Sequence, residues 1–139
     1  EMTSSLVGSE MCIRDSTCAV HVRGGDIVGP GRAFFERALA RMEKERSGLR
    51  YLVFTNDREA AKEALEGEHT ERKMTYISEL GAFSDIDEFF LMAACRHQII
   101  SNSSYSTWAA YLNPNPEKVV IMPEYKGCEQ IRLKEWIVL

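Results

Sequence analysis

The sequence predicts an α/β domain built on a Rossmann-like parallel sheet with helices on both faces. Short apolar runs that are typical of buried strands alternate along the chain with amphipathic segments of helical spacing. Polar turn residues follow the strand-like runs, as expected where a strand leads into a crossover helix. The 139 residues, 45% of them hydrophobic, suffice for one domain with a buried core.

The first half of the chain contains two strand–helix units and a further strand. Residues 18–22 form an apolar run that opens into a glycine turn, and residues 32–46 place apolar side chains at helical spacing. Residues 51–54 predict the second strand, which is followed by polar residues that can cap a helix at 58–66. A third strand is expected at residues 74–77.

The second half continues the same alternation. Residues 84–87 resemble a capping box, which precedes a helix predicted at 88–95. Residues 97–100 predict a strand, and the hydroxyl-rich turn at 101–106 leads into a helix at 107–112.

The carboxyl-terminal end of the chain shows a pattern of predicted elements, whereas the amino-terminal end does not. Residues 118–122 predict another strand, residues 123–130 a loop, and the apolar residues 136–139 are expected to pack against the sheet. Residues 1–16 lack any such pattern and resemble the translation of a transposase-type sequencing adapter. We therefore expect a non-native leader at 1–16 and one domain at 17–139, which would be a fragment of a longer protein.

Composition argues against several classes of protein. The formal net charge of −4 offers no basic surface for a nucleic acid, and no segment approaches the roughly 18 consecutive apolar residues of a membrane span. The cysteines, Cys12, Cys18, Cys95 and Cys128, lack the paired short spacings of a zinc site, so we expect unpaired thiols. These features favour a cytoplasmic protein.

Three polar turns are expected to meet at one edge of the sheet, because turns after parallel strands gather at the carboxyl ends of those strands. They contain Arg23, residues 55–57 and residues 101–106. Arginine suits a phosphate because its planar fork donates two parallel hydrogen bonds, and a serine-rich helix start adds the positive end of a helix dipole. The alternatives are a surface ion pair of Arg23 with Asp26, and a serine cap that serves only its own helix.

The nearby carboxylate and imidazole groups also have two interpretations each. Glu88 either complements a helix dipole or accepts two N–H donors of a guanine base. His21 lies two residues before Arg23, on the same face of the strand, and could contact a phosphate or a sugar. His97 is expected to be a structural, hydrogen-bonded histidine and His69 a solvated one.

Three motifs carry a resemblance to a known family. The run His21-Val22-Arg23-Gly24-Gly25-Asp26 resembles the His-x-Arg-Arg-x-Asp motif of the α-1,2-fucosyltransferases and their α-1,6- and protein O-fucosyltransferase relatives. Residues 51–57 resemble the second motif of that group. Residues 88–112 are similar to the third motif of bacterial α-1,2-fucosyltransferases, LM-x-x-C-x-H-x-II-x-NS-x-[YF]-S-x-W-x-A-x-L. The resemblance covers nearly everything from residue 18 onward.

This resemblance implies the donor-binding lobe of a two-lobed (GT-B) glycosyltransferase, with the acceptor lobe missing. The implied reaction is the inverting transfer of L-fucose from GDP-fucose to the 2-hydroxyl of a galactoside-terminated glycan, without a metal or another cofactor. The full-length enzyme is expected in the cytoplasm, with peripheral membrane association as an alternative, and this fragment alone is expected to be inactive.

The family pattern also assigns roles to residues. Arg23 would be the catalytic residue, which holds the diphosphate and stabilises the charge of the departing GDP. His21 and Asp26 would contact the donor, and Glu88 would bind guanine. The phosphate-binding turn would contribute Asn102, Ser103, Ser104 and Ser106.

The sequence departs from the family pattern at three positions. Gly24 stands where many relatives have a second arginine, Glu88 replaces the commoner aspartate, and Thr107 replaces a tryptophan. Because the acceptor lobe is missing, an α-1,6-type fucosyltransferase stays an alternative. Gly24 favours a second alternative, a non-catalytic guanine-nucleotide-binding module.

Overall fold

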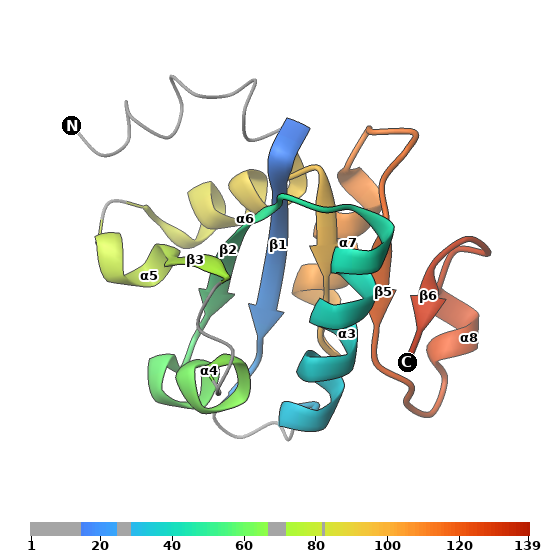
Figure 1. Cartoon of the computed structure of the whole chain (residues 1–139), viewed down its shortest axis with the longest axis horizontal. Helices are drawn as coiled ribbons and strands as arrows, with labels where there is room; N and C mark the ends of the chain where they lie inside the picture. The colour runs from blue at the N-terminus through green and yellow to red at the C-terminus, as the bar shows by residue number, and fades with distance from the viewer. Residues whose placement is uncertain (1–14, 25–28, 67–71, 82) are drawn as a thin grey trace.

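A computed structural model describes residues 15–24, 29–66, 72–81 and 83–139. In these ranges six strands form one sheet of order β3-β2-β1-β4-β5-β6, in which every neighbouring pair is parallel (Figure 1). The strands are β1 (Thr17–Val22), β2 (Arg50–Thr55), β3 (Lys73–Tyr76), β4 (His97–Ile99), β5 (Val120–Met122) and β6 (Ile137–Val138). The predicted Rossmann-like α/β class is confirmed.

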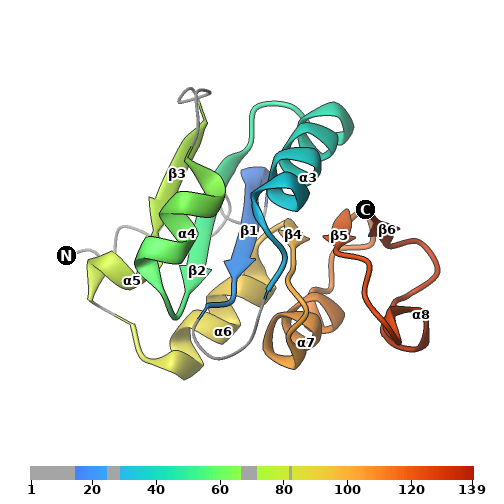
Figure 2. The same cartoon turned by 90° about the horizontal axis from the view of Figure 1, so that it is seen from below.

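Helices cover both faces of this sheet, as Figure 2 shows. One face carries α3 (Arg32–Glu45) and α4 (Arg58–Leu65). The other face carries α5 (Ile77–Leu80), α6 (Asp85–Ala94) and α7 (Ser104–Leu112). The short helix α8 (Cys128–Ile131) lies beside β6.

The alternation of side chains along β1 explains the two layers. Cys18, Val20 and Val22 pack into the core beneath α3 and α4, whereas Ala19 packs on the opposite face with residues of α6 and α7. Each of these side chains is at most 3% exposed. Because β1 is buried on both faces, its sequence is a nearly continuous apolar run.

The structure differs from the predicted elements in short segments. Ile77 begins α5 instead of ending the third strand. The capping box of Ser84 and Asp87 is confirmed, but α6 already begins at Asp85 rather than at residue 88. Helix α8, of four residues, forms within the predicted loop, and the two residues of β6 pair with β5 as a sixth strand. Elements this short show no periodicity in a sequence.

The structure bears on the expectations from composition only within the described ranges. Cys18, Cys95 and Cys128 are buried free thiols, as expected, and Cys12 lies outside the described residues. Within the described ranges, no helix combines the length and the apolar character needed to cross a bilayer. Most of the expected leader, residues 1–14, also lies outside these ranges.

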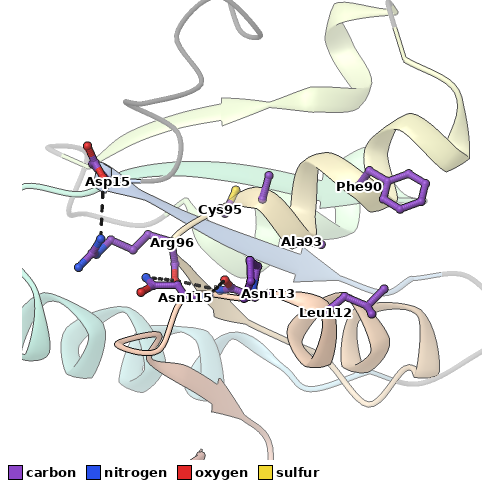
Figure 3. Close-up of a pocket in the computed structure, with 10 residues that line it drawn as sticks. Asp15, Phe90, Ala93, Cys95, Arg96, Leu112, Asn113 and Asn115 are labelled. Carbon is purple, nitrogen blue, oxygen red and sulfur yellow. Dashed lines mark hydrogen bonds and ion pairs between the residues drawn. The ribbon is translucent and has the colours of Figure 1, made fainter.

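A buried amide network ties α7 to the amino end of β4, and Figure 3 shows the part of this network at Arg96 and Asn113. The side-chain amide of Asn113 donates to the carbonyl oxygen of Arg96 and to Oε1 of Gln98, both at 3.0 Å. Nε2 of Gln98 donates in turn to the carbonyl oxygens of Met92 and Cys95, at 3.1 and 3.2 Å. The network therefore fixes β4 against the ends of both α6 and α7.

We expect Asn113→Ala to lower the free energy of unfolding by about 1–3 kcal/mol, because it leaves the buried Oε1 of Gln98, on β4, without its donor. Urea unfolding followed by circular dichroism measures this loss. Asn115→Ala is the control, since Asn115 is only partly buried and reaches the Arg96 carbonyl oxygen at 3.4 Å. Equal stability of the Asn113 variant and the parent chain would contradict the structural role.

Candidate functional site

β1 and β4 are neighbours in the sheet, but the chain leaves them in opposite directions. β1 leads to α3 on one face, whereas β4 leads to α7 on the other. Such a reversal opens a crevice beyond the carboxyl ends of the two strands, which is where α/β sheets bind their ligands. The predicted turns that contain Arg23 and Ser103 follow these two strands.

A cavity of about 380 Å³ lies at this carboxyl edge. Three of the predicted site residues, His21, Arg23 and Glu88, line it. The other lining residues come from the end of β2 and the first turns of α6 and α7, and they are Phe54, Thr55, Asn56, Asp85 and Tyr105. Basic, acidic and aromatic side chains from four elements therefore surround one space.

Arg23 is the basic group of the cavity. Its Nε is buried and has no hydrogen-bond partner among the described residues. A buried donor of this kind is costly unless a ligand or a water supplies an acceptor, and a guanidinium prefers an anionic one. Asp26, the predicted ion-pair alternative and a predicted donor contact, lies outside the described residues.

Asn56 holds the backbone beside Arg23. The Gly24 N–H donates to Asn56 Oδ1 at 2.8 Å, and Asn56 Nδ2 donates back to the Gly24 carbonyl oxygen at 3.2 Å. A Cβ added to Gly24 would lie 2.5 Å from Cβ of Asp57, the residue that caps α4. The second arginine of many relatives would therefore not fit here without displacing Asp57.

His21 forms a neutral polar part of the wall. The side chain is 5% exposed, and its Nδ1 lies 2.7 Å from Oγ of Ser101. Its ring centroid lies 5.6 Å from that of Tyr105. Burial and, to a smaller extent, the charge of Arg23 lower the pKa of His21 to about 4, so the imidazole is uncharged at pH 7.

The first turn of α6 adds two carboxylates to the cavity. Burial, and then the charge of Asp85, raises the pKa of Glu88 above its ordinary value. The hydroxyl of Tyr105 donates to the carbonyl oxygen of Asp85 at 2.9 Å, which joins α7 to this turn. No role in the site was predicted for Asp85 or for Tyr105, although Tyr105 occupies the [YF] position of the third motif. The available signals were weak: Asp85 lies one helical turn before Glu88, and Tyr105 lies within the serine-rich turn.

The predicted serines serve mainly the structure of their own turn. Oγ of Ser103 accepts the Tyr105 N–H at 3.2 Å and so caps α7. Ser106 is fully buried, and its hydroxyl accepts the N–H of Ser101 at 3.4 Å. Ser104 is the exposed first residue of α7. These serines are not among the residues that line the cavity, and their phosphate contacts stay a prediction.

The serine-rich turn and the Arg23 turn nevertheless lie at the same edge of the sheet. They meet at Gly29, where an added Cβ would lie 2.8 Å from the Arg23 carbonyl oxygen and 3.7 Å from Asn102 Oδ1. Asn102, like the serines, lies beside the cavity rather than in its wall. The expected convergence of the two turns is thus confirmed.

A second cavity, of about 400 Å³, lies at the opposite edge, between the carboxyl-terminal ends of α6 and α7 (Figure 3). Its wall is largely apolar, with Phe90 and Leu112 on facing helices. Arg96, its basic group, already has acidic partners in Glu117, at 3.3 Å, and Asp15, at 3.9 Å. The described residues contain no cluster of three His, Cys, Asp or Glu side chains that could hold a metal ion.

The model of glycosyl transferase family 11 matches residues 5–139. The O-antigen biosynthesis glycosyltransferase WbnK of Escherichia coli is 29% identical over 125 residues, which cover 81% of this chain and 40% of WbnK. The chain thus spans less than half the length of this relative. No solved structure matches the chain.

We expect Gly24→Ala to lower the free energy of unfolding by about 1–3 kcal/mol, since the new methyl group must displace Asp57. Chemical unfolding measures the loss. Gly31→Ala is the control for the added methyl group, because a Cβ on Gly31 meets nothing within 4 Å and any effect comes from its place as the N-cap of α3. Equal stabilities of the two variants would contradict the close packing at Gly24.

Stability should also depend on the two buried histidines. Burial is the larger cause that lowers the pKa of both His21 and His97 to about 4, from an ordinary value of 6.5. Between these values the unfolded chain binds more protons than the folded chain. The free energy of unfolding should therefore be highest above about pH 6.5 and fall as the pH decreases toward 4.

Urea unfolding across this pH range tests the dependence on the histidines. The His21→Phe variant should show a shallower fall than the parent chain, because only one of the two groups remains. A stability that is constant or rises as the pH is lowered would contradict the assignment.

Proposed function

The chain belongs to glycosyl transferase family 11, a family of fucosyltransferases, and from this premise we propose that it is the donor-binding part of an inverting fucosyltransferase. The proposed reaction transfers L-fucose from GDP-fucose to the 2-hydroxyl of a galactoside and requires no metal ion or other cofactor. The observation that carries the proposal is that Arg23 and Glu88 line one cavity at the carboxyl edge of the sheet.

The two charged groups suit the two ends of a guanine nucleotide. The Arg23 guanidinium can donate parallel hydrogen bonds to diphosphate oxygens, which supply the acceptor that its buried Nε lacks among the described residues. The Glu88 carboxylate can accept the adjacent N1–H and 2-amino donors of guanine. Adenine has no N1–H donor, so a carboxylate at this place favours guanine.

The proposed role of Arg23 in the reaction is electrostatic stabilisation of the leaving group. As the acceptor hydroxyl gives up its proton to a general base, its oxygen forms a bond to C1 of fucose. The bond between C1 and the β-phosphate oxygen breaks on the opposite face, which inverts the anomeric centre. The electron pair of the broken bond leaves with GDP, and negative charge builds on the diphosphate. Arg23 stabilises this charge, a contribution that is worth several kcal/mol in sites of this kind.

The acceptor and its place in the cell are also part of the proposal. WbnK is described as an enzyme of O-antigen biosynthesis. By analogy we propose a galactoside-terminated glycan of a bacterial polysaccharide as the acceptor, and an enzyme that works in the cytoplasm or at the membrane surface. The acceptor site would belong to the part of a family-length protein that this chain does not contain.

We expect Arg23→Ala to weaken GDP binding by about 10- to 100-fold, the usual effect of losing hydrogen bonds to a charged group. Isothermal titration calorimetry of the chain with GDP measures the change. The melting temperature should stay nearly constant, because Arg23 makes no hydrogen bond through Nε to the described residues. Arg41→Ala is the matched control, since Arg41 lies on α3 and pairs with Glu45.

Unchanged GDP affinity, or a collapse of folding in the Arg23 variant, would contradict the proposed role. The reaction itself needs a family-length protein that carries this chain, assayed for GDP release with lactose. GDP binding without release would favour the non-catalytic module, and a product linked at the 6-hydroxyl would favour the α-1,6 alternative.

A further inference from the structure

One side-chain contact links β1 to the turn after β4, the two neighbouring strands whose following helices lie on opposite faces of the sheet. Oγ of Ser101, in the turn after β4, lies 2.7 Å from Nδ1 of His21, at the end of β1. Ser101 is 0% exposed and His21 is 5% exposed, so water does not compete for this bond. The contact joins the turn that leads to α7 directly to the wall of the cavity.

The direction of this hydrogen bond follows from the other contacts of Ser101. Among the described residues, its hydroxyl has no other acceptor within hydrogen-bond distance. If the imidazole donated, the buried hydroxyl proton would have no partner, at a cost of about 1–3 kcal/mol. The hydroxyl therefore donates to Nδ1, and the neutral ring carries its proton on Nε2.

The ring of His21 is thus an oriented donor beside Arg23. Nδ1 is engaged by Ser101, and Nε2 has no hydrogen-bond partner in the described part of the chain. The ring lines the same cavity as Arg23, and the ring of Tyr105 packs against it with a centroid separation of 5.6 Å. A neutral N–H next to a guanidinium suits an anionic oxygen, because it adds a hydrogen bond without adding a second buried charge.

We propose that Ser101 is a positioning residue, which fixes His21 as the Nε2–H tautomer so that the ring donates to a diphosphate oxygen of the bound nucleotide. This inference rests on the proposed function for the identity of the ligand. Ser106 extends the arrangement, because its hydroxyl accepts the Ser101 N–H at 3.4 Å and so links Ser101 to α7. The start of α7 would thereby act on the ligand through His21.

The tautomer is measured directly by nitrogen-15 NMR of the imidazoles in the 139-residue chain. In the parent chain His21 should show a protonated Nε2 and an unprotonated Nδ1. In Ser101→Ala a mixture of the two tautomers is expected. Thr107→Val is the matched control, because Thr107 is also buried at the start of α7 but its hydroxyl bonds only the Ser103 carbonyl oxygen, at 2.8 Å.

Calorimetric titration with GDP, and separately with inorganic pyrophosphate, measures the consequence for binding. Ser101→Ala should weaken both by about 2- to 10-fold, the effect of one hydrogen bond, and Thr107→Val should change neither. In a His21→Phe background the Ser101 substitution should have no further effect, since Ser101 acts only through the ring.

Two results would overturn the inference: a His21 ring protonated at Nδ1 in the parent chain, or unchanged affinities in Ser101→Ala. The first measurement needs no variant, so it decides the matter even if Ser101→Ala does not fold. Failure of GDP to bind, with pyrophosphate still bound and sensitive to Ser101, would instead contradict the proposed nucleotide and support the role of Ser101.

Discussion

The parallel pairing of β1 with β4 is the constraint on which the site depends. The register aligns Cys18 with His97 and Val20 with Ile99, so the chains that leave the two strands emerge side by side at one edge. At the opposite edge, Asn113 and Gln98 hold β4 against its helices through buried amide bonds. Backbone pairing therefore positions His21 and Arg23 beside the turn that follows β4 before either residue meets a ligand.

The charged groups of the cavity are arranged so that a ligand can complete their hydrogen bonding. Arg23 brings a buried donor without a partner among the described residues, and Glu88 brings a carboxylate whose pKa is raised by burial. His21 adds an uncharged group, because burial lowers the pKa of its imidazole, and Ser101 orients the ring. A ligand with an anionic end and an end rich in N–H donors would satisfy these groups, and a guanine nucleotide has both.

The arrangement of strands and the identity of the charged groups could be predicted from the sequence, because a strand buried on both faces leaves an apolar run and turns after parallel strands converge. His21 and Arg23 were predicted to lie at this edge in this way, whereas Glu88 was predicted from the resemblance to a known family. Asp85 was not predicted, and Tyr105 was predicted only as part of the turn at 101–106, because their contribution to the cavity depends on how α6 and α7 pack against each other. The packing of Gly24 against Asp57 likewise cannot be predicted from a motif, in which Gly24 is recognised only by the absence of an arginine.

The most direct test of the central claim is the location of the bound nucleotide. We would titrate the isotopically labelled chain with GDP and follow the backbone amide signals by NMR. The account predicts that the largest shifts cluster at Arg23, Asn56, Glu88 and Tyr105, around the cavity at the carboxyl edge. Shifts concentrated instead at Ala94, Arg96 and Asn113, around the cavity at the amino edge, would contradict it.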